Sequence, residues 1–296
     1  MPISGYFREG IHAMTTQTKQ IVFGHSPDSD DAFMFYALAK GHVKVPGYEI
    51  GHRLEDIQSL NVRAATGELD ITAISAAVYP RVAQHYRIMS CGASVGRNYG
   101  PVVVSRKPMT PGQLAGKKIG IPGEHTTSWM LFRIFVTEPV TPVFLNFESV
   151  GPAVLEGKVD AGILLHEGQI LYQRQGLHGV LDLGKKWFET TKLPIPLGLD
   201  CVHRRLGGKV SQAAADALRA SVVYARSHEH DALDYALAYG RGIAKEDARK
   251  FVRMYVNDDT VDMGEEGRRA LEMLYRLAAE RGIIPAAPKL DLVQAK

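Results

Sequence analysis

Two segments of this sequence repeat the same short pattern, and that repeat constrains the fold more than any other feature. Ala65–Ile71 reads Ala-Thr-Gly-Glu-Leu-Asp-Ile, and Leu155–Ala161 reads Leu-Glu-Gly-Lys-Val-Asp-Ala. In both, a helix-like stretch ends at glycine, the residue that most readily closes a helix, and an apolar strand-like run follows. Each segment also comes after a strand, a loop and a helix. We therefore predict one α/β fold unit that occurs twice along the chain.

The predicted elements follow the same order in each half. In the first half they are the strand Gln20–Gly24, the helices Asp31–Lys40 and Ile57–Thr66, and the strands Leu69–Ile74 and Pro101–Arg106. In the second half they are the strand Lys118–Pro122, the helices Thr127–Val136 and Ser149–Glu156, the strand Val159–Leu165 and the helix His166–Gln175. Good helix formers then dominate Ala213–Arg226 and Glu265–Arg281.

This layout predicts two α/β lobes with mostly parallel sheets and a central cleft. The first lobe comprises residues 20–107 and 200–296, and the second is inserted as residues 108–199. Two extended hinge crossings are expected at Val102–Lys107 and Pro194–Val202, the second because proline restricts the residue before it. Such a layout is that of type II periplasmic-binding-protein folds. Since that fold serves transporters, regulators and enzymes, it does not by itself choose a function.

Composition and charge exclude several classes of protein. The formal net charge is +3 and the basic residues are scattered, which argues against a nucleic-acid partner. No apolar run is long enough for a membrane helix, so no membrane partner is expected. Cys91 and Cys201, the only cysteines, are predicted to be buried free thiols. Residues 1–19 resemble no signal peptide. We expect a cytoplasmic protein with a disordered extension at 1–19, starting at Met1 or Met14.

Four loops are candidates for ligand binding. They are His25–Asp31, Ile74–Ala76, Gly123–Ser128 and Leu165–Gly168, and each follows a predicted strand. In open α/β sheets, ligands bind beyond the carboxyl ends of the strands. Two of these loops come from each lobe, so we expect them to face one another across the cleft.

The loop Gly123–Ser128 is predicted to bind an anion. It leads into a helix and carries three consecutive hydroxyl groups, on Thr126, Thr127 and Ser128. A helix start presents free backbone amides that suit a carboxylate or phosphate. The N-cap requires only one hydroxyl, so the other two are available for another role. Thr127 and Ser128 are therefore expected to hold a substrate carboxylate.

The loop Ser26–Asp31 has a different chemistry, because Asp28, Asp30 and Asp31 crowd the first turn of a helix. Acids at this position complement the helix dipole, which accounts for at least one of them. Several carboxylates in a cleft would repel an anion and prefer sugar hydroxyls. The loop lacks the further oxygen ligands and the terminal glutamate of a calcium loop, so no metal is expected there.

His166 is the candidate general base. It follows the strand of the second lobe and precedes Glu167, which could orient it. The intrinsic pKa of histidine suits proton transfer near neutral pH, and the strand end places the residue in the predicted cleft. His125 is a competing base, but its threonine neighbours favour a binding role. No Gly-x-Ser-x-Gly elbow, Walker loop or Gly-x-Gly-x-x-Gly follows a strand.

Several motifs, in order along nearly the whole chain from residue 20, resemble the 1,4-dihydroxy-6-naphthoate synthase family. They are Leu54-Glu55-Asp56 with Leu60-Asn61, Gly100-Pro101-Val102-Val103-Val104, Gly123-x-His125-Thr126-Thr127, Leu165-His166-Glu167-Gly168, Leu193-Pro194-x-Pro196-Leu197-Gly198, Tyr255-Val256-Asn257 and Gly264-Glu265-Glu266-Gly267. The His-Thr-Thr and His-Glu-Gly elements are the most specific.

The resemblance implies a lyase of the futalosine route to menaquinone, which cleaves cyclic dehypoxanthine futalosine to 1,4-dihydroxy-6-naphthoate. It implies a small aromatic carboxylate as ligand and no metal or organic cofactor. His166 corresponds to the family's proton acceptor. Substrate contacts correspond to Ala73, Ile74, Ser75, Thr127 and Ser128; His125, Ser26 and Asp31 complete the predicted site.

Two departures from the family pattern bear on the substrate. The family's first loop usually reads Ser-Pro-Cys-Pro-Asn-Asp, whereas residues 26–31 read Ser-Pro-Asp-Ser-Asp-Asp. A lysine is common where this chain has Ala73. Chorismate dehydratase, or another paralogue of the same pathway and fold, is therefore an alternative. A solute-binding protein of a transporter is a second alternative, and the oligomeric state is left open.

Overall fold

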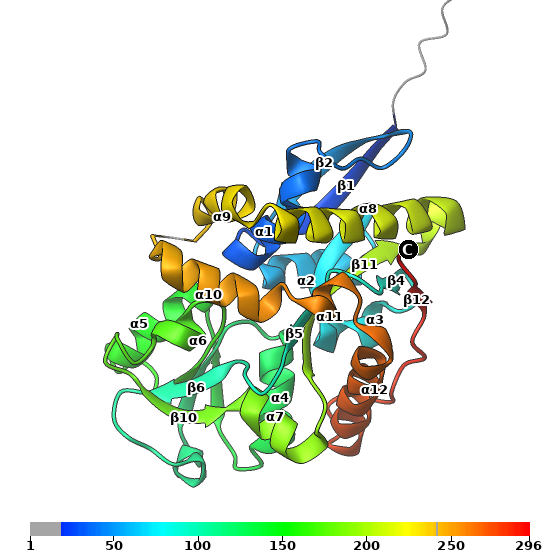
Figure 1. The fold of residues 1–296 in the computed structure, drawn as a ribbon. Helices are drawn as coiled ribbons and strands as arrows, with labels where there is room; N and C mark the ends of the chain where they lie inside the picture. The colour runs from blue at the N-terminus through cyan, green and yellow to red at the C-terminus, as the bar shows by residue number, and fades with distance from the viewer. Residues whose placement is uncertain (1–18, 241) are drawn as a thin grey trace, which may run out of the picture.

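The computed structural model describes residues 19–240 and 242–296. The predicted extension at 1–19 and the alternative start at Met14 lie outside these ranges, apart from Lys19, which begins the first strand. The described chain forms two β-sheets flanked by helices (Figure 1). Within these ranges no helix is long and apolar enough to cross a membrane.

The larger sheet belongs to the first lobe. Over the described residues it has seven strands in the order β12-β4-β11-β3-β1-β2, with β5 also paired to β11. The strands are β1 Lys19–His25, β2 Tyr48–Leu54, β3 Ile71–Ser75, β4 Tyr86–Met89, β5 Ser94–Gly96, β11 Ile195–His203 and β12 Leu292–Val293. β1 is parallel to β2 and β3, whereas β11 is antiparallel to β3, β4 and β5.

The smaller sheet belongs to the second lobe and has the order β10-β6-β9-β7-β8. Its strands are β6 Val102–Ser105, β7 Lys118–Ile121, β8 Thr141–Phe144, β9 Ala161–Leu164 and β10 His178–Asp182. β7 is parallel to β8 and β9, as β1 is to β2 and β3. Gly67 and Gly157 have φ of 69° and 73°, the left-handed conformation that glycine adopts readily. The predicted repeat is thus present, but both sheets are mixed rather than mostly parallel.

Helices cover both faces of each sheet. The α-helices are α1 Ser29–Ala39, α2 Ile57–Ala65, α3 Tyr79–Val82, α4 Thr127–Phe135, α5 Phe147–Leu155, α6 Gly168–Leu171, α7 Leu183–Thr191, α8 Gly207–Ser227, α9 Glu229–Leu237, α10 Lys245–Tyr255, α11 Asp258–Val261 and α12 Gly264–Glu280. Short polar side chains accept backbone amides at several helix starts; Asp28 does so for α1 and Thr126 for α4. These two N-caps set the points at which the first and third predicted ligand-binding loops end and their helices begin.

The crossings between the lobes lie just before the predicted hinge segments and share only Pro194 with them. β6 pairs with β9 and β10, so the first crossing is residues 97–101, between β5 and β6. β11 pairs with β3 and β4, so the second crossing is residues 192–194, between α7 and β11. The hinges predicted at Val102–Lys107 and Pro194–Val202 were wrong in position, and the chain changes sheet at these crossings rather than at residues 107 and 199. An apolar β-branched run has the same local sequence pattern in a sheet strand and in an extended crossing, and only its pairing partner distinguishes the two.

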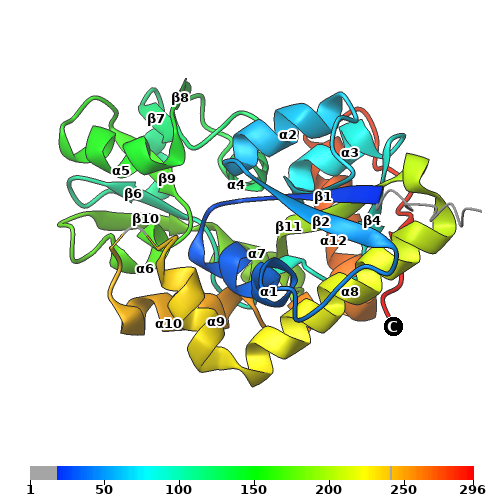
Figure 2. The same cartoon turned by 90° about the horizontal axis from the view of Figure 1, so that it is seen from above.

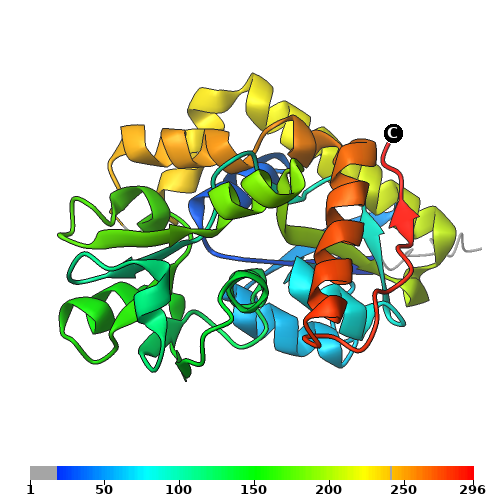
Figure 3. The ribbon, with the colours of Figure 1, turned by 90° about the horizontal axis from the view of Figure 1, so that it is seen from below.

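Two hydrophobic cores hold the elements around the cleft. One lies where α1, α8, α9 and α10 pack on the first sheet, and includes Phe23, Phe35 and Leu218. The other joins the lobes, because it includes Phe132 of α4 and Tyr275 of α12. Figures 2 and 3 show the two sheets side by side, with the second sheet and α5 on one side of the molecule and the first sheet on the other. The shared core holds the start of α4 against the strand ends of the first lobe.

Candidate functional site

All four predicted loops line a cavity between the lobes. The cavity has a volume of about 100 Å³. The predicted site residues in its lining are Ser26, Asp31, Ala73, Ile74, Ser75, Thr127, Ser128 and His166. His125 is not among the lining residues. The structure therefore brings together every predicted site residue except one, while the role of each stays a prediction.

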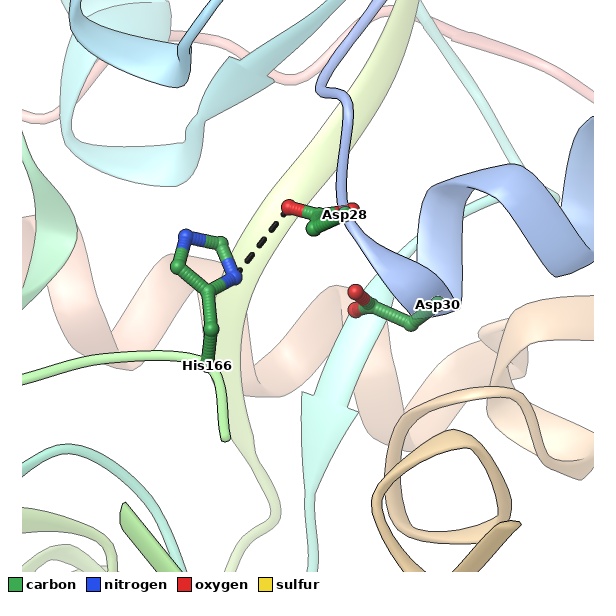
Figure 4. A group of neighbouring side chains, drawn as sticks. All are labelled: Asp28, Asp30 and His166. Carbon is green, nitrogen blue, oxygen red and sulfur yellow. Dashed lines mark ion pairs between the residues drawn. The ribbon is translucent and has the colours of Figure 1, made fainter. Parts of the chain in front are cut away.

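His166 faces the first lobe and is held by it. Its Nδ1 lies 3.1 Å from Oδ2 of Asp28, and its side chain is only 16% exposed (Figure 4). Phe147 packs against the imidazole edge to face, with 4.8 Å between ring centroids. The other ring nitrogen, Nε2, is buried and has no hydrogen-bond partner among the described residues. One nitrogen is thus engaged and the other is free to accept a proton.

The backbone at His166 is unusual. Its φ is 49°, in the left-handed region, which residues other than glycine seldom adopt. A residue in this conformation is not part of a right-handed helix, so the helix predicted at His166–Gln175 starts later; α6 spans only Gly168–Leu171. The side-chain amide of Gln169 is oriented so that both its oxygen and its nitrogen have partners. The oxygen accepts a hydrogen bond from the backbone amide of His166 at 3.0 Å, and the nitrogen donates one to Tyr255 Oη at 2.7 Å. These contacts hold the strained turn against α10.

Glu167 does not orient the imidazole, contrary to our hypothesis. Its carboxylate accepts a hydrogen bond from the hydroxyl of Ser29 at the start of α1, in the other lobe. Adjacent residues at a turn point in different directions, so Glu167 is turned away from the His166 ring. Asp28 takes the orienting position instead, and sequence reasoning did not pair it with His166.

Four acidic side chains line the cavity, all of them buried: Asp28, Asp30, Asp31 and Asp200. Burial raises the pKa of Asp200 to about 8. Burial and then the charge of Asp28 raise the pKa of both Asp30 and Asp31 well above the usual value. Burial acts in the same direction on Asp28, but His166 and hydrogen bonds from its own loop lower the pKa of Asp28 below the usual value. These shifts favour the charged form of Asp28 and the protonated form of the other three carboxyl groups, and a protonated carboxyl group can donate a hydrogen bond.

One group of side chains has the composition of a cation site. Ligand atoms of Asp28, Asp30 and His166 all lie within 4.8 Å of one another (Figure 4). These are oxygen and imidazole ligands, which suit a divalent transition metal. Such an ion would take Nδ1 of His166 and leave the proton on Nε2. A metal and a base at Nε2 are therefore alternatives, and the absence of a metal stays a prediction.

The start of α4 is the candidate anion site. Thr126 is the N-cap, since its hydroxyl accepts from the amide of Trp129 at 3.3 Å. The hydroxyl of Thr127 is not free: it donates to the carbonyl of Leu197 at 2.6 Å and accepts from the amide of Ala77 at 3.1 Å. The prediction that this hydroxyl binds substrate therefore does not fit the structure. The backbone amides of Thr127 and Ser128, which have no partner among the described residues, are the better donors.

His125 lies in the wrong place for a base in this cavity. Its ring lines a separate depression on the far side of the α4 start and is 3.3 Å from Arg81. Burial and then the charge of Arg81 lower the pKa of His125. Its backbone is held by Gln58, whose side-chain oxygen accepts from the His125 amide at 3.0 Å. His125 thus helps to join the lobes, and no contact places it in the cavity.

Sequence reasoning missed several lining residues, above all Asp200 and Tyr255. Asp200 lies within β11, where its neighbours Leu199 and Cys201 are apolar and buried. A charged residue inside a buried strand is costly unless it is neutralised, so this pattern was a usable signal. Tyr255 belongs to the motif Tyr255-Val256-Asn257 that resembles the family, but nothing in the sequence placed it in the cavity, because an aromatic residue on a helix is most often part of the core.

Comparison with known proteins identifies the family. A protein-family model described as menaquinone biosynthesis matches residues 21–280. A protein of Thermus thermophilus named 1,4-dihydroxy-6-naphthoate synthase is 38% identical over 266 residues, 90% of this chain and 96% of the relative. A protein of Streptomyces coelicolor with the same name is 37% identical, over 92% of this chain and 97% of the relative. This chain belongs to the menaquinone biosynthesis family.

Solved structures agree with the predicted fold. A crystal structure of a protein from Archaeoglobus fulgidus matches the chain with a TM-score of 0.86 and 44% identity, covering 90% of this chain and 98% of that one. The alkanesulfonate-binding protein of Xanthomonas axonopodis matches with a TM-score of 0.68 at 14% identity, over 93% of this chain and 98% of that one. At such low identity the second match shows only the fold. The predicted two-lobed periplasmic-binding-protein type of fold is confirmed.

Proposed function

We propose that this protein is a carbon–carbon lyase that converts cyclic dehypoxanthine futalosine into 1,4-dihydroxy-6-naphthoate, with His166 as the general base. The two relatives named 1,4-dihydroxy-6-naphthoate synthase support the reaction. The cavity between the lobes supports a small-molecule substrate enclosed by both of them. Aromatisation of the product would drive a cleavage that begins with removal of a proton.

The observation that carries this proposal is the state of the imidazole of His166. Its Nδ1 is engaged by Asp28, and its Nε2 is buried without a partner among the described residues. A buried nitrogen without a partner is costly in a folded protein, so a ligand is expected to supply the missing hydrogen bond. A substrate bound with its acidic proton next to Nε2 could transfer that proton to the free lone pair of this nitrogen.

The substrate carboxylate is expected at the start of α4. Among the described residues that line the cavity there is no lysine or arginine, so neutral donors must hold the negative charge. The free amides of Thr127 and Ser128 and the dipole of α4 provide such donors. The carboxyl groups of Asp30, Asp31 and Asp200, whose raised pKa values favour the protonated form, would donate to hydroxyl and carbonyl oxygens elsewhere on the substrate.

The test is turnover of the purified protein, followed by mass spectrometry of the naphthoate product. His166→Asn should lower turnover by about 10²–10⁴-fold, the usual contribution of a positioned acid–base group. Substrate binding should change much less, because asparagine keeps approximate size and some hydrogen bonding. His230→Asn is a matched control, since the side chain of His230 is 75% exposed and is not among the residues that line the cavity. Near-normal turnover by His166→Asn would refute the assignment of the base.

Two alternative functions give different results in the same assay. Loss of the family lysine at Ala73 keeps chorismate dehydratase, or a related paralogue, in consideration. Conversion of chorismate without conversion of the futalosine-derived compound would favour it. Binding of that compound by the wild-type protein without any turnover would favour a solute-binding protein.

A further inference from the structure

Asp28 and His166 come from opposite lobes and meet inside the cavity. Asp28 follows β1 of the first lobe, and His166 follows β9 of the second. Their side chains are 3% and 16% exposed, and 3.1 Å separates Oδ2 of Asp28 from Nδ1 of His166. Figure 4 shows the carboxylate and the imidazole facing one another across the gap between the two loops. No other carboxylate is within ion-pair distance of this ring among the described residues.

We propose that Asp28 is the positioning residue for His166: its carboxylate accepts a hydrogen bond from Nδ1–H, which leaves Nε2 as the proton acceptor of the reaction. This inference rests on the proposed function. The carboxylate of an ionised aspartate has no proton to donate, so the nitrogen that faces it must carry one. A neutral imidazole has a single N–H, and Nε2 then necessarily has the lone pair.

The carboxylate of Asp28 is fixed in place by the helix that it caps. Its Oδ1 accepts from the amide of Asp31 at 3.2 Å, as the N-cap of α1. The second oxygen, Oδ2, is thereby turned towards His166 and away from the helix. The capping hydrogen bond therefore holds the Asp28 carboxylate in the orientation that faces His166, and the Asp28 side chain loses no conformational freedom when the substrate binds.

The charges around the imidazole support one ionised partner. Two carboxyl groups lie near this ring, Asp28 and Asp30, both at the start of α1, whereas Glu167 is turned away from it. Glu167 is engaged by the hydroxyl of Ser29. Burial and the charge of Asp28 raise the pKa of Asp30, whereas His166 and hydrogen bonds within its loop lower the pKa of Asp28 despite its burial, so the negative charge is favoured on Asp28. One charge matches the single positive charge that His166 acquires when it accepts a proton.

The lobes must be closed for this pair to exist. Three contacts bridge the same gap: Asp28 with His166, Ser29 with Glu167, and Tyr255 with Gln169. If the lobes separate, His166 loses its orienting partner together with its access to the substrate. The base would then be set in the correct tautomer only when the substrate is enclosed and water is excluded.

The experiment compares the variants Asp28→Asn and Asp28→Ser with Ser29→Ala. Asparagine and serine are both good N-caps, so α1 should start normally, and circular dichroism checks that each variant folds. Asparagine can donate to Nδ1 and so stabilise the wrong tautomer, whereas serine is too short to reach it. Both should lower kcat by about 10²–10⁴-fold with a much smaller effect on KM. Ser29→Ala breaks a contact across the same gap but leaves Asp28 in place.

Two readouts separate positioning from a general loss of structure. The acidic limb of the pH–rate profile should move to lower pH in Asp28→Asn, because the imidazolium loses the carboxylate that stabilises it. Ser29→Ala should leave that limb where it is. Nitrogen-15 chemical shifts of labelled histidine, with His166 assigned by its absence in His166→Asn, should show the Nδ1–H tautomer in the wild type and in Ser29→Ala but not in Asp28→Asn.

The outcomes distinguish the failure of this inference from the failure of the proposed function. Wild-type kcat and an unshifted acidic limb in Asp28→Asn would overturn the positioning role while leaving the lyase intact. An Nε2–H tautomer in the wild type would overturn it as well. Absence of turnover by the wild type, together with the expected tautomers, would instead reject the proposed reaction and retain the Asp28–His166 pair.

Discussion

Asp200 provides a stability test that does not depend on the reaction. Its side chain lies in β11, is 1% exposed, and has one oxygen, Oδ1, without a hydrogen-bond partner among the described residues. Burial raises the pKa of Asp200 from 3.8 to about 8. The substitution Asp200→Asn keeps the shape of the side chain and removes the ionisation.

The size and sign of the effect follow from this shift. A carboxyl group with a raised pKa in the folded state causes no loss of stability below its unfolded pKa of 3.8, and the loss grows until the pH reaches about 8. Between those limits the free energy of unfolding should fall by about 1.4 kcal/mol for each pH unit. The side chain of the Asp200→Asn variant cannot ionise, so the variant has no such loss. From about pH 5.5 to about pH 7.5, the variant should therefore gain about 3 kcal/mol relative to the wild type.

Urea denaturation of both proteins at these two pH values measures the difference directly. Asp258→Asn is a suitable control, because the side chain of Asp258 is 97% exposed and its substitution should give the same small effect at both pH values. The reasoning would be refuted if Asp200→Asn and the wild type differed by the same amount at both pH values. Asp200 would then ionise as it does in the unfolded chain, despite its burial.

Two further predictions concern the junction of the lobes. Gly184→Ala should lower the free energy of unfolding by at least about 1–3 kcal/mol, because the new Cβ would overlap the carbonyl carbon of Tyr99 in the first crossing. Gly208→Ala is the control: the space around the new Cβ is open, so this substitution should be neutral or should stabilise α8 by up to about 1 kcal/mol. Thr127→Val should cost about 1–3 kcal/mol in urea denaturation, since it leaves the Ala77 amide and Leu197 carbonyl without their partner, whereas Thr127→Ser should keep both bonds. Equal stabilities within either pair would contradict the packing or hydrogen bonding described above.

Much of the fold could be predicted because it depends on short-range patterns. The glycines at positions 67 and 157 end their helices in the left-handed conformation, as the repeat indicated. The four loops at strand ends do converge on one cavity. Two edge strands, β2 and β8, were not predicted, since neither contains a fully buried residue or an apolar run. The first hinge was misplaced because the apolar run Val102–Ser105 has the same local pattern whether it pairs with a strand of the second sheet or crosses between the lobes.

The amino-acid sequence alone determined the α/β class, the duplicated unit, the strand-end loops and His166 as the candidate base. Each of these depends on residues that are neighbours along the chain. Only the tertiary structure decided that Asp28 faces His166, that the hydroxyl of Thr127 is already engaged, and that His125 lies outside the cavity. Those outcomes depend on how two lobes close on one another. Contacts between residues distant in sequence are set by the packing of whole elements, and local sequence patterns do not encode which side chains that packing brings within hydrogen-bonding distance of one another.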